Sequence, residues 1–295
     1  MFPNGKMTGA HQPNPLRTLL VLARASNLPT VWSNCLAGWL LGGGGEPFRF
    51  FWLCVGATLL YTGGMFLNDA FDADFDRQHR RQRPIPSGAV KAREVWLSGF
   101  IFLGFGAVTL AWMGKITAIL TILLVLCILI YDLIHKLIFL SPVLMACCRL
   151  LLYLVAASIS INGISGLAVW SAIALAAYIV GLSYLARKET SRGPLRNWPV
   201  FFLFTPICLA LLVNDANQQQ TAFIISLALA VWILWCLRHT FWKPQRNIGV
   251  TVSRLLAGIA LVDWLAVGAG TQSISLVFVA LFFAALVFQK FIPAT

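Results

Sequence analysis

Long apolar runs separated by short polar connections recur along the whole chain. They cover residues 28–45, 48–68, 94–113, 115–132, 139–161, 166–186, 198–213, 220–238, 249–269 and 272–291. About 20 apolar residues in a helix are enough to cross the hydrocarbon core of a bilayer, and membrane-spanning segments must satisfy their backbone polar groups internally. The pattern predicts an all-α, polytopic transmembrane bundle of ten helices, or nine if one of the last two segments does not cross.

The polar start of the chain differs from the rest. Residues 1–27 contain prolines and basic residues and lack the apolar core and cleavage site of a signal peptide. No long polar linker divides the remainder. We therefore expect residues 1–27 to form a cytoplasmic N-terminal segment and residues 28–295 to form a single transmembrane domain.

The connections between apolar runs alternate between ones rich in Lys and Arg and ones that have almost none. Only Arg49 and Lys115 of the 22 Lys and Arg fall on one side of the implied topology. The positive-inside rule makes the side rich in Lys and Arg, with both termini, cytoplasmic. The net charge of +12 is then explained by these loops, so no nucleic-acid partner is expected. We expect a multi-pass protein in contact with the lipid bilayer, in a bacterial inner membrane, with its active site facing the cytoplasm.

The strongest chemical signal lies where the second apolar run ends. With ~100° per residue, a continuing helix would place four oxygen-bearing side chains on one face and turn Asp74 away. The four are Asn68, Asp69, Asp72 and Asp76, in a chain with only ten Asp and Glu. Such oxygens, with room for water and phosphate, suit Mg²⁺. The simpler alternative is a solvated helix end whose acids pair with nearby arginines.

A basic loop follows the acids directly. It carries Arg80 and Arg83, and its Pro84, Pro86 and Gly88 are typical of an ordered turn after a helix end. Guanidinium groups suit phosphate oxygens. The loop therefore fits a combined metal and phosphate site, although topology or anionic lipid alone would also explain its charge.

Other charged positions are candidates for the same cavity. Lys136, after Tyr131, either reaches into it or marks a helix end. Arg149 lies inside an apolar run, where an arginine normally faces a bundle interior or a water-filled cavity. Asp263 is similar, so Arg149 either binds substrate or forms a structural ion pair with Asp263. The third cytoplasmic loop offers Glu189 as a metal ligand or base, or is an ordinary cationic loop.

Cysteines and histidines add no site of their own. The seven cysteines form no CxxC and mostly lie inside apolar runs, which favours small buried hydrophobic residues. The four histidines show no metal-ligand spacing, and none is assigned to a metal.

The Asn68–Asp76 pattern NDxxDxxxD, followed by Arg83-Pro84-Ile85-Pro86-Ser87-Gly88, resembles the UbiA superfamily of intramembrane prenyltransferases. The resemblance implies a helical bundle around a lipid-accessible cavity. It also implies Mg²⁺-dependent ionisation of an isoprenyl diphosphate and prenyl transfer to a hydrophobic or aromatic acceptor.

The resemblance and the residue arguments above together give each candidate a role. Asp72, Asp76 and Lys136 would be catalytic. The metal would be held by Asn68, Asp69, Asp72, Asp76 and Glu189. The diphosphate would be bound by Arg24, Arg80, Arg83, Lys136 and Arg149.

The chain departs from the family in its third loop, where Glu189 stands in place of a second Asp pair, DxxxD. The chain resembles the EboC-type branch in three respects: this departure, a short spacer before Arg83, and the sequence Leu-Ser-Tyr-Leu-Ala-Arg-Lys-Glu at residues 182–189. Two rivals to a transferase remain. A terpene cyclase would need no acceptor, and a non-catalytic isoprenoid or metabolite carrier would bind the diphosphate without breaking it.

Overall fold

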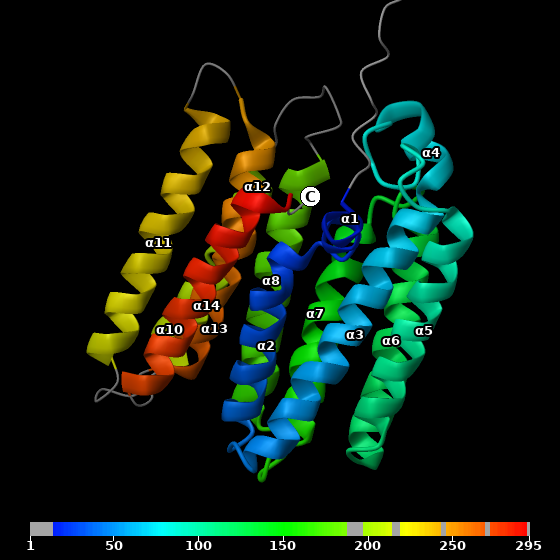
Figure 1. Ribbon diagram of the computed structural model, residues 1–295. Coiled ribbons are helices and arrows are strands. Elements are labelled where there is room, and N and C mark those ends of the chain that lie inside the picture. Colours follow the sequence, from blue (N-terminus) through cyan, green and yellow to red (C-terminus); the bar gives the residue numbers. More distant parts are fainter. Residues whose placement is uncertain (1–13, 188–196, 214–218, 243–245, 269–271, 294–295) are drawn as a thin grey trace, which may run out of the picture.

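The computed structural model describes residues 14–187, 197–213, 219–242, 246–268 and 272–293, and within these ranges the regular structure is entirely helical (Figure 1). The helices run α1 (Pro15–Leu22), α2 (Leu28–Leu41), α3 (Pro47–Phe71), α4 (Ala73–His79), α5 (Ala92–Ala111), α6 (Lys115–Ile134), α7 (Ser141–Ser158), α8 (Gly166–Arg187), α9 (Trp198–Leu203), α10 (Thr205–Val213), α11 (Gln219–Phe241), α12 (Ile248–Ala257), α13 (Ile259–Val267) and α14 (Gln272–Phe291), with a short 3₁₀ turn at Ala25–Asn27.

Each of the ten expected apolar segments corresponds to one of these helices or to a consecutive pair. Eight spans among the described residues are long and apolar enough to cross a membrane: α3, α5, α6, α7, α8, α11, α12 with α13, and α14. The pair α9–α10 is shorter, and α2 has 14 residues. The predicted all-α, polytopic transmembrane bundle is confirmed.

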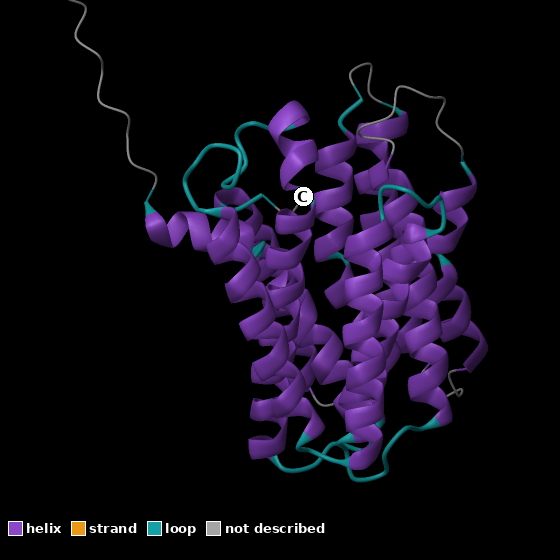
Figure 2. Cartoon of the chain, turned by 90° about the vertical axis from the view of Figure 1, so that its right-hand side faces the viewer, coloured by secondary structure: helices purple, strands orange, loops and turns teal. Residues whose placement is uncertain are grey.

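Helix starts follow from local sequence. Pro29, Pro47, Pro142 and Pro199 occupy the first or second helical position of α2, α3, α7 and α9, where a missing backbone N–H costs nothing. Helix α1 runs across the bundle rather than along it, at the left of Figure 2. The chain therefore enters the bundle from the side, close to one end.

Glycines set the close packing of α3 against α5. Gly56 and Gly63 on α3 face Gly106 and Gly99 on α5, and an added Cβ at Gly63 would lie 2.6 Å from the Leu103 backbone nitrogen. Small residues allow membrane helices to approach closely without a hydrophobic driving force. This contact fixes the position of α3 along the bundle axis relative to α5, and hence the position of the acidic stretch at the end of α3.

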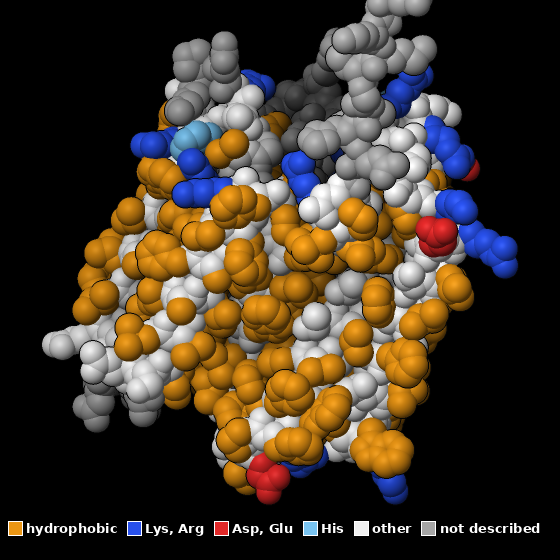
Figure 3. Space-filling view, viewed as in Figure 1, with side chains coloured by type: hydrophobic (Ala, Val, Ile, Leu, Met, Phe, Trp, Pro, Cys, Tyr) orange, Lys and Arg blue, Asp and Glu red, His pale blue; other side chains and the backbone are white. Residues whose placement is uncertain are grey.

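The surface has a wide apolar belt with its cations gathered at one end (Figure 3). That end carries the loops after α3, α6 and α11, whereas Arg49 and Lys115 lie at the opposite end, where α3 and α6 begin. The core forms two main clusters, one around α2, α3, α5 and α7 and the other around α8, α11, α12 and α13. A cavity lies between them.

Candidate active site

The cavity has a volume of about 790 Å³ and changes character along its length. At the end rich in basic loops it is lined by Asp72, Asp76, Arg80, Arg83 and Lys136. Farther in, its walls are the apolar side chains Val31, Leu60, Leu124, Ile128, Leu152, Ile179 and Leu182. One chamber therefore joins a charged mouth to an apolar interior.

The acidic stretch is almost one continuous helix. Helix α3 ends at Phe71 and α4 begins at Ala73, but Asp72 between them keeps helical dihedrals and its carbonyl accepts from the Asp76 amide at 2.9 Å. Asn68, Asp69, Asp72 and Asp76 are all buried, whereas the Asp74 side chain is 90% exposed. The predicted arrangement, four oxygen-bearing side chains on one face and Asp74 turned away, is confirmed.

Arg83 ties the loop after α4 back onto these acids. Its Nη1 donates to Asp69 Oδ1 at 2.6 Å, and its Nε lies 3.7 Å from Asp76 Oδ2. Burial raises the pKa of Asp76, against the opposing effect of Arg83. The other oxygen of Asp76, Oδ1, is buried and has no hydrogen-bond partner among the described residues. A carboxylate held in this way favours a further cation beside it.

The end of α6 and the two residues after it face the acidic stretch of α3 and α4. Asp132 accepts a hydrogen bond from Asn68 Nδ2 at 3.0 Å, and Lys136 Nζ lies 2.6 Å from Asp72 Oδ1. His135 Nε2 adds a contact with the same Asp72 oxygen at 3.4 Å. Burial alone would raise the pKa of Asp72, but hydrogen bonds from His135 and Lys136 outweigh it and hold the pKa below its ordinary value. Asp72 is therefore ionised at neutral pH.

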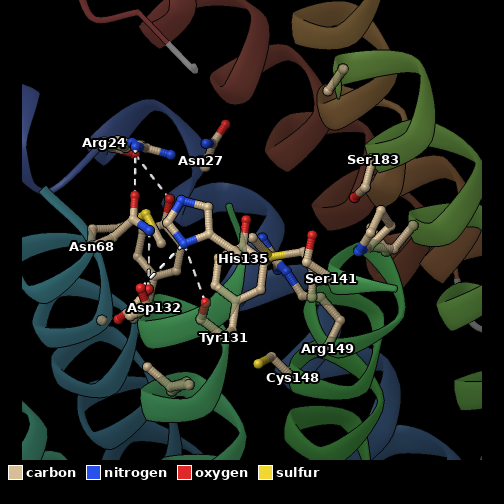
Figure 4. A pocket seen from close by; sticks show the side chains of 18 of the residues that line it. Arg24, Asn27, Asn68, Tyr131, Asp132, His135, Ser141, Cys148, Arg149 and Ser183 are labelled. Atoms are coloured by element: carbon tan, nitrogen blue, oxygen red, sulfur yellow. Dashed lines mark hydrogen bonds between the residues drawn. The ribbon is translucent and has the colours of Figure 1, made fainter. Parts of the chain in front are cut away.

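Arg24 closes the charged mouth from the opposite side. Its Nη2 donates to Asn68 Oδ1 at 3.1 Å and approaches Asp69 Oδ1 at 3.3 Å. The backbone of Arg24 is left-handed, with φ 42° and ψ 49°, a conformation that is uncommon outside glycine. Such strain persists where surrounding contacts enforce it, often at functional sites. Arg24, Asn68 and Asp132 form a relay in which each side chain hydrogen-bonds the next (Figure 4).

A second relay of the same composition lies around Arg149. Arg149 Nη1 donates to Asn34 Oδ1 at 2.6 Å, and Asn34 Nδ2 donates to Asp263 Oδ2 at 2.7 Å. Ser33 donates to the same Asp263 oxygen at 2.5 Å. The structure thus does not contain the direct Arg149–Asp263 ion pair that was one of the two alternatives, because Asn34 lies between the charges. The other alternative, a role in substrate binding, stays a prediction.

Comparison with known proteins assigns the chain to a family. A model of the UbiA prenyltransferase family matches residues 27–249, well over half of the 295 residues. The chain belongs to the UbiA prenyltransferase family.

Curated relatives of this UbiA-family chain match it locally. A 4-hydroxybenzoate octaprenyltransferase of Paracidovorax citrulli is 34% identical over 116 residues, 34% of this chain and 39% of the relative. A digeranylgeranylglyceryl phosphate synthase of Methanopyrus kandleri is 33% identical over 96 residues, 32% of this chain and 35% of the relative. The chain thus spans about two fifths or less of the length of these relatives.

Solved structures of UbiA homologues share the fold over nearly the whole chain. A homologue from Archaeoglobus fulgidus bound to GPP and Mg²⁺ superimposes with a TM-score of 0.65 at 15% identity, covering 92% of this chain and 99% of that one. A homologue from Aeropyrum pernix gives a TM-score of 0.51 at 16% identity, covering 92% and 98%. At this identity the match establishes the common fold.

The sequence-predicted residues of this UbiA-family chain separate into groups. The structure joins Arg24, Asn68, Asp69, Asp76 and Arg83 in one network of side-chain contacts, and it pairs Asp72 with Lys136. Arg80 lines the same cavity without an ion-pair partner among the described residues. Arg149 also lines the cavity but contacts α2 instead of the acids. Glu189 lies outside the described residues.

Several polar side chains of the site were not predicted. Asp132, near the end of α6, and His135, directly after it, face the acids. Their positions four residues and one residue before Lys136 are the sequence signal that points to them. Asn34 and Thr30 on α2 hold Arg149. Their roles follow from which helices meet, and the local sequence gives no sign of that.

The donor set fits Mg²⁺. Carboxylate and amide oxygens are the ligands this cation takes, and Asn68, Asp72 and Asp76 supply them from consecutive helical turns. Within the described ranges no three His, Cys, Asp or Glu side chains already converge as a metal-binding group. Lys136, His135 and Arg83 instead hold the acids. The buried Asp76 Oδ1, which has no partner among the described residues, is the oxygen to which a cation would bind.

Proposed function

We propose that this protein is a Mg²⁺-dependent prenyltransferase of the membrane, which ionises an isoprenyl diphosphate and transfers the prenyl group to a hydrophobic or aromatic acceptor. One observation carries the proposal: a single cavity joins a mouth of buried acids and cations to an apolar interior. Its volume of about 790 Å³ lies within the usual range for small-molecule sites, roughly 300–1,000 Å³.

The residues at the mouth divide the work. Asn68, Asp72 and Asp76 would hold Mg²⁺, with Asp69 fixed by Arg24 and Arg83 as a support. Mg²⁺ bound there would neutralise charge developing on the departing diphosphate. Arg80, Arg83 and Lys136 would bind the diphosphate oxygens, with Lys136 moving from Asp72 towards the phosphate.

The interior would protect the allylic cation. Apolar side chains such as Leu60, Ile128 and Leu152 exclude water, which would otherwise capture the cation. A prenyl chain lying along them would leave its reactive carbon near the mouth, and an acceptor held beside it would react through proximity. The excess of Lys and Arg at this end supports a cytoplasmic orientation of the mouth, and we propose that orientation in a bacterial inner membrane.

Turnover by purified protein tests this function. Protein in lipid nanodiscs is incubated with prenyl diphosphates of increasing length and a lipid extract, with or without Mg²⁺. Diphosphate release and product masses are then measured. We expect Mg²⁺-dependent release and a product heavier than the acceptor by one prenyl group. Asp76→Asn should abolish release, while Asp74→Asn, on the exposed side of the same helix, should not.

The rivals give different results. A product formed without an acceptor would indicate a cyclase. Mg²⁺-dependent binding of the diphosphate without release would indicate a carrier, and full activity in Asp76→Asn would remove the acidic stretch from the mechanism.

A further inference from the structure

The hydrogen bonds of Arg149 use only part of its guanidinium. Nη1 donates to the Thr30 carbonyl at 3.1 Å and to Asn34 Oδ1 at 2.6 Å, and Nη2 donates to Thr30 Oγ1 at 3.1 Å. Arginine has five N–H donors, two on each Nη and one on Nε. Among the described residues, two of these donors have no partner: one on Nη2 and the one on Nε, which form the side fork of the guanidinium.

Arg149, which carries this remaining fork, lines the cavity. Its side chain is only partly buried, and its Nε is not among the sealed polar atoms that lack a partner. Two parallel N–H groups in one plane match a carboxylate or phosphate. Thr30 and Asn34 hold the guanidinium from behind, so the fork is fixed in direction before any ligand arrives.

The fork is separate from the charged mouth. Arg149 lies about two turns into α7 from Ser141, roughly 12 Å along the helix, and its guanidinium approaches the Tyr61 ring at 5.9 Å. No described carboxylate is within ion-pair distance of Arg149. Figure 4 shows Arg149 apart from Arg24, Asn68 and Asp132. The mouth already supplies Arg24, Arg80, Arg83 and Lys136 for a diphosphate.

We propose that Arg149 binds the anionic group of the acceptor, a carboxylate or phosphate, inside the cavity. This inference rests on the proposed function, since it assumes a second substrate beside the prenyl chain. An oxyanion on the fork would hold the acceptor among apolar walls formed by Val31, Cys148 and Leu152. Its negative charge would also compensate a cation that is otherwise balanced only through Asn34 by Asp263.

Equilibrium binding without turnover tests the proposal. With Mg²⁺ chelated, dissociation constants are measured for two matched pairs of probes: 4-hydroxybenzoate against its methyl ester, and glycerol 1-phosphate against glycerol. We expect the wild type to bind one of the two anions about tenfold or more tighter than its neutral partner, the effect of one or two charge-assisted hydrogen bonds. Whichever pair shows the preference identifies the oxyanion.

Variants connect the preference to the fork. Arg149→Gln should abolish it, and Arg149→Lys, which keeps the charge without the fork, should weaken it. Arg254→Gln is the matched control, because Arg254 lies in α12 against Trp235 and does not line the cavity. If Arg149→Gln does not fold, the Arg149→Lys result decides.

Three results would overturn the proposal. The wild type could bind both members of each pair equally, or the preference could survive in the Arg149 variants. The affinity for geranyl diphosphate could instead fall more than about tenfold in Arg149→Gln, which would assign the fork to the donor. Diphosphate release by the wild type is scored separately, so the prenyltransferase proposal stands or fails independently.

Discussion

A single methyl group at Gly63 should disturb the site from a distance. An added Cβ there would lie 2.6 Å from the Leu103 amide nitrogen and 2.8 Å from the Gly99 carbonyl oxygen. Both are backbone atoms of α5, which cannot rotate away. Ordinary contact begins near 3.4 Å, so α3 and α5 must separate by several tenths of an ångström or more.

The size of the effect follows from a matched pair of substitutions. Gly63→Ala and Gly104→Ala both replace a glycine inside a helix and gain up to ~1 kcal/mol of helix propensity. An added Cβ at Gly104 would meet nothing within 4 Å. Overpacking costs about 1–3 kcal/mol, so Gly63→Ala should be less stable than Gly104→Ala by about that amount, or roughly 3–10 °C in Tm.

The assay combines stability with activity. Tm is followed by intrinsic fluorescence in detergent, and Mg²⁺-dependent diphosphate release is measured on the same samples. Gly63 lies about 7 Å along α3 from Asn68, so a shifted helix should lower release about tenfold, because misplacement by 1 Å can cost ~10²-fold. Equal Tm values for the two variants would refute the idea that the glycine contact sets the position of α3 along the bundle axis relative to α5.

Three further predictions concern the charged mouth. Lys136→Met should lower kcat/KM for the diphosphate about tenfold. Its free energy of unfolding should fall by less than ~1 kcal/mol, because the Lys136 side chain is 34% exposed and its ion pair is screened; a large loss of Tm would contradict this. Asp72→Asn should lower Tm at pH 7, because a carboxyl whose native pKa is lowered stabilises the fold at any pH above its ordinary pKa of 3.8. The Tm difference from wild type should close as the pH falls through the native pKa. Asp76→Asn should instead raise Tm at pH 7, because the native pKa of Asp76 is raised, and Tm shifts of the same sign in both variants would contradict the assignment. Arg80→Gln should raise the KM for the diphosphate without changing Tm, whereas Arg83→Gln should change both because it also frees Asp69 and Asp76, and equal Tm losses would oppose this distinction.

The fold and the acidic face could be predicted because both depend on local periodicity. Apolar runs of spanning length indicate helices whatever their neighbours are, and ten such runs became helices or helix pairs. The side chains from Asn68 to Asp76 share a face because the helical period survives the junction at Asp72. The turn at Pro84–Gly88 likewise follows from its own residues.

Contacts between distant helices could not be predicted in the same way. Asn34 and Asp263 are separated by 229 positions. The sequence of α2 alone does not indicate that the amide of Asn34 joins Arg149 to Asp263. The sequence suggested the two charges as direct partners because both are rare inside apolar runs. Asp132 was overlooked for a related reason: its role depends on facing Asn68, which follows only from the packing of α6 against α3.

Two relays of Arg, Asn and Asp share one logic. In each, the guanidinium fixes the amide orientation, because it can only donate: the asparagine oxygen faces the arginine and the amide nitrogen donates to the aspartate. A direct Arg–Asp pair would occupy the guanidinium and hide it from a ligand. An intervening asparagine lets the carboxylate compensate the charge from a distance while part of the arginine stays available. Arg149 is thus held in a fixed orientation with part of its guanidinium available, whereas Arg24 also pairs directly with Asp69.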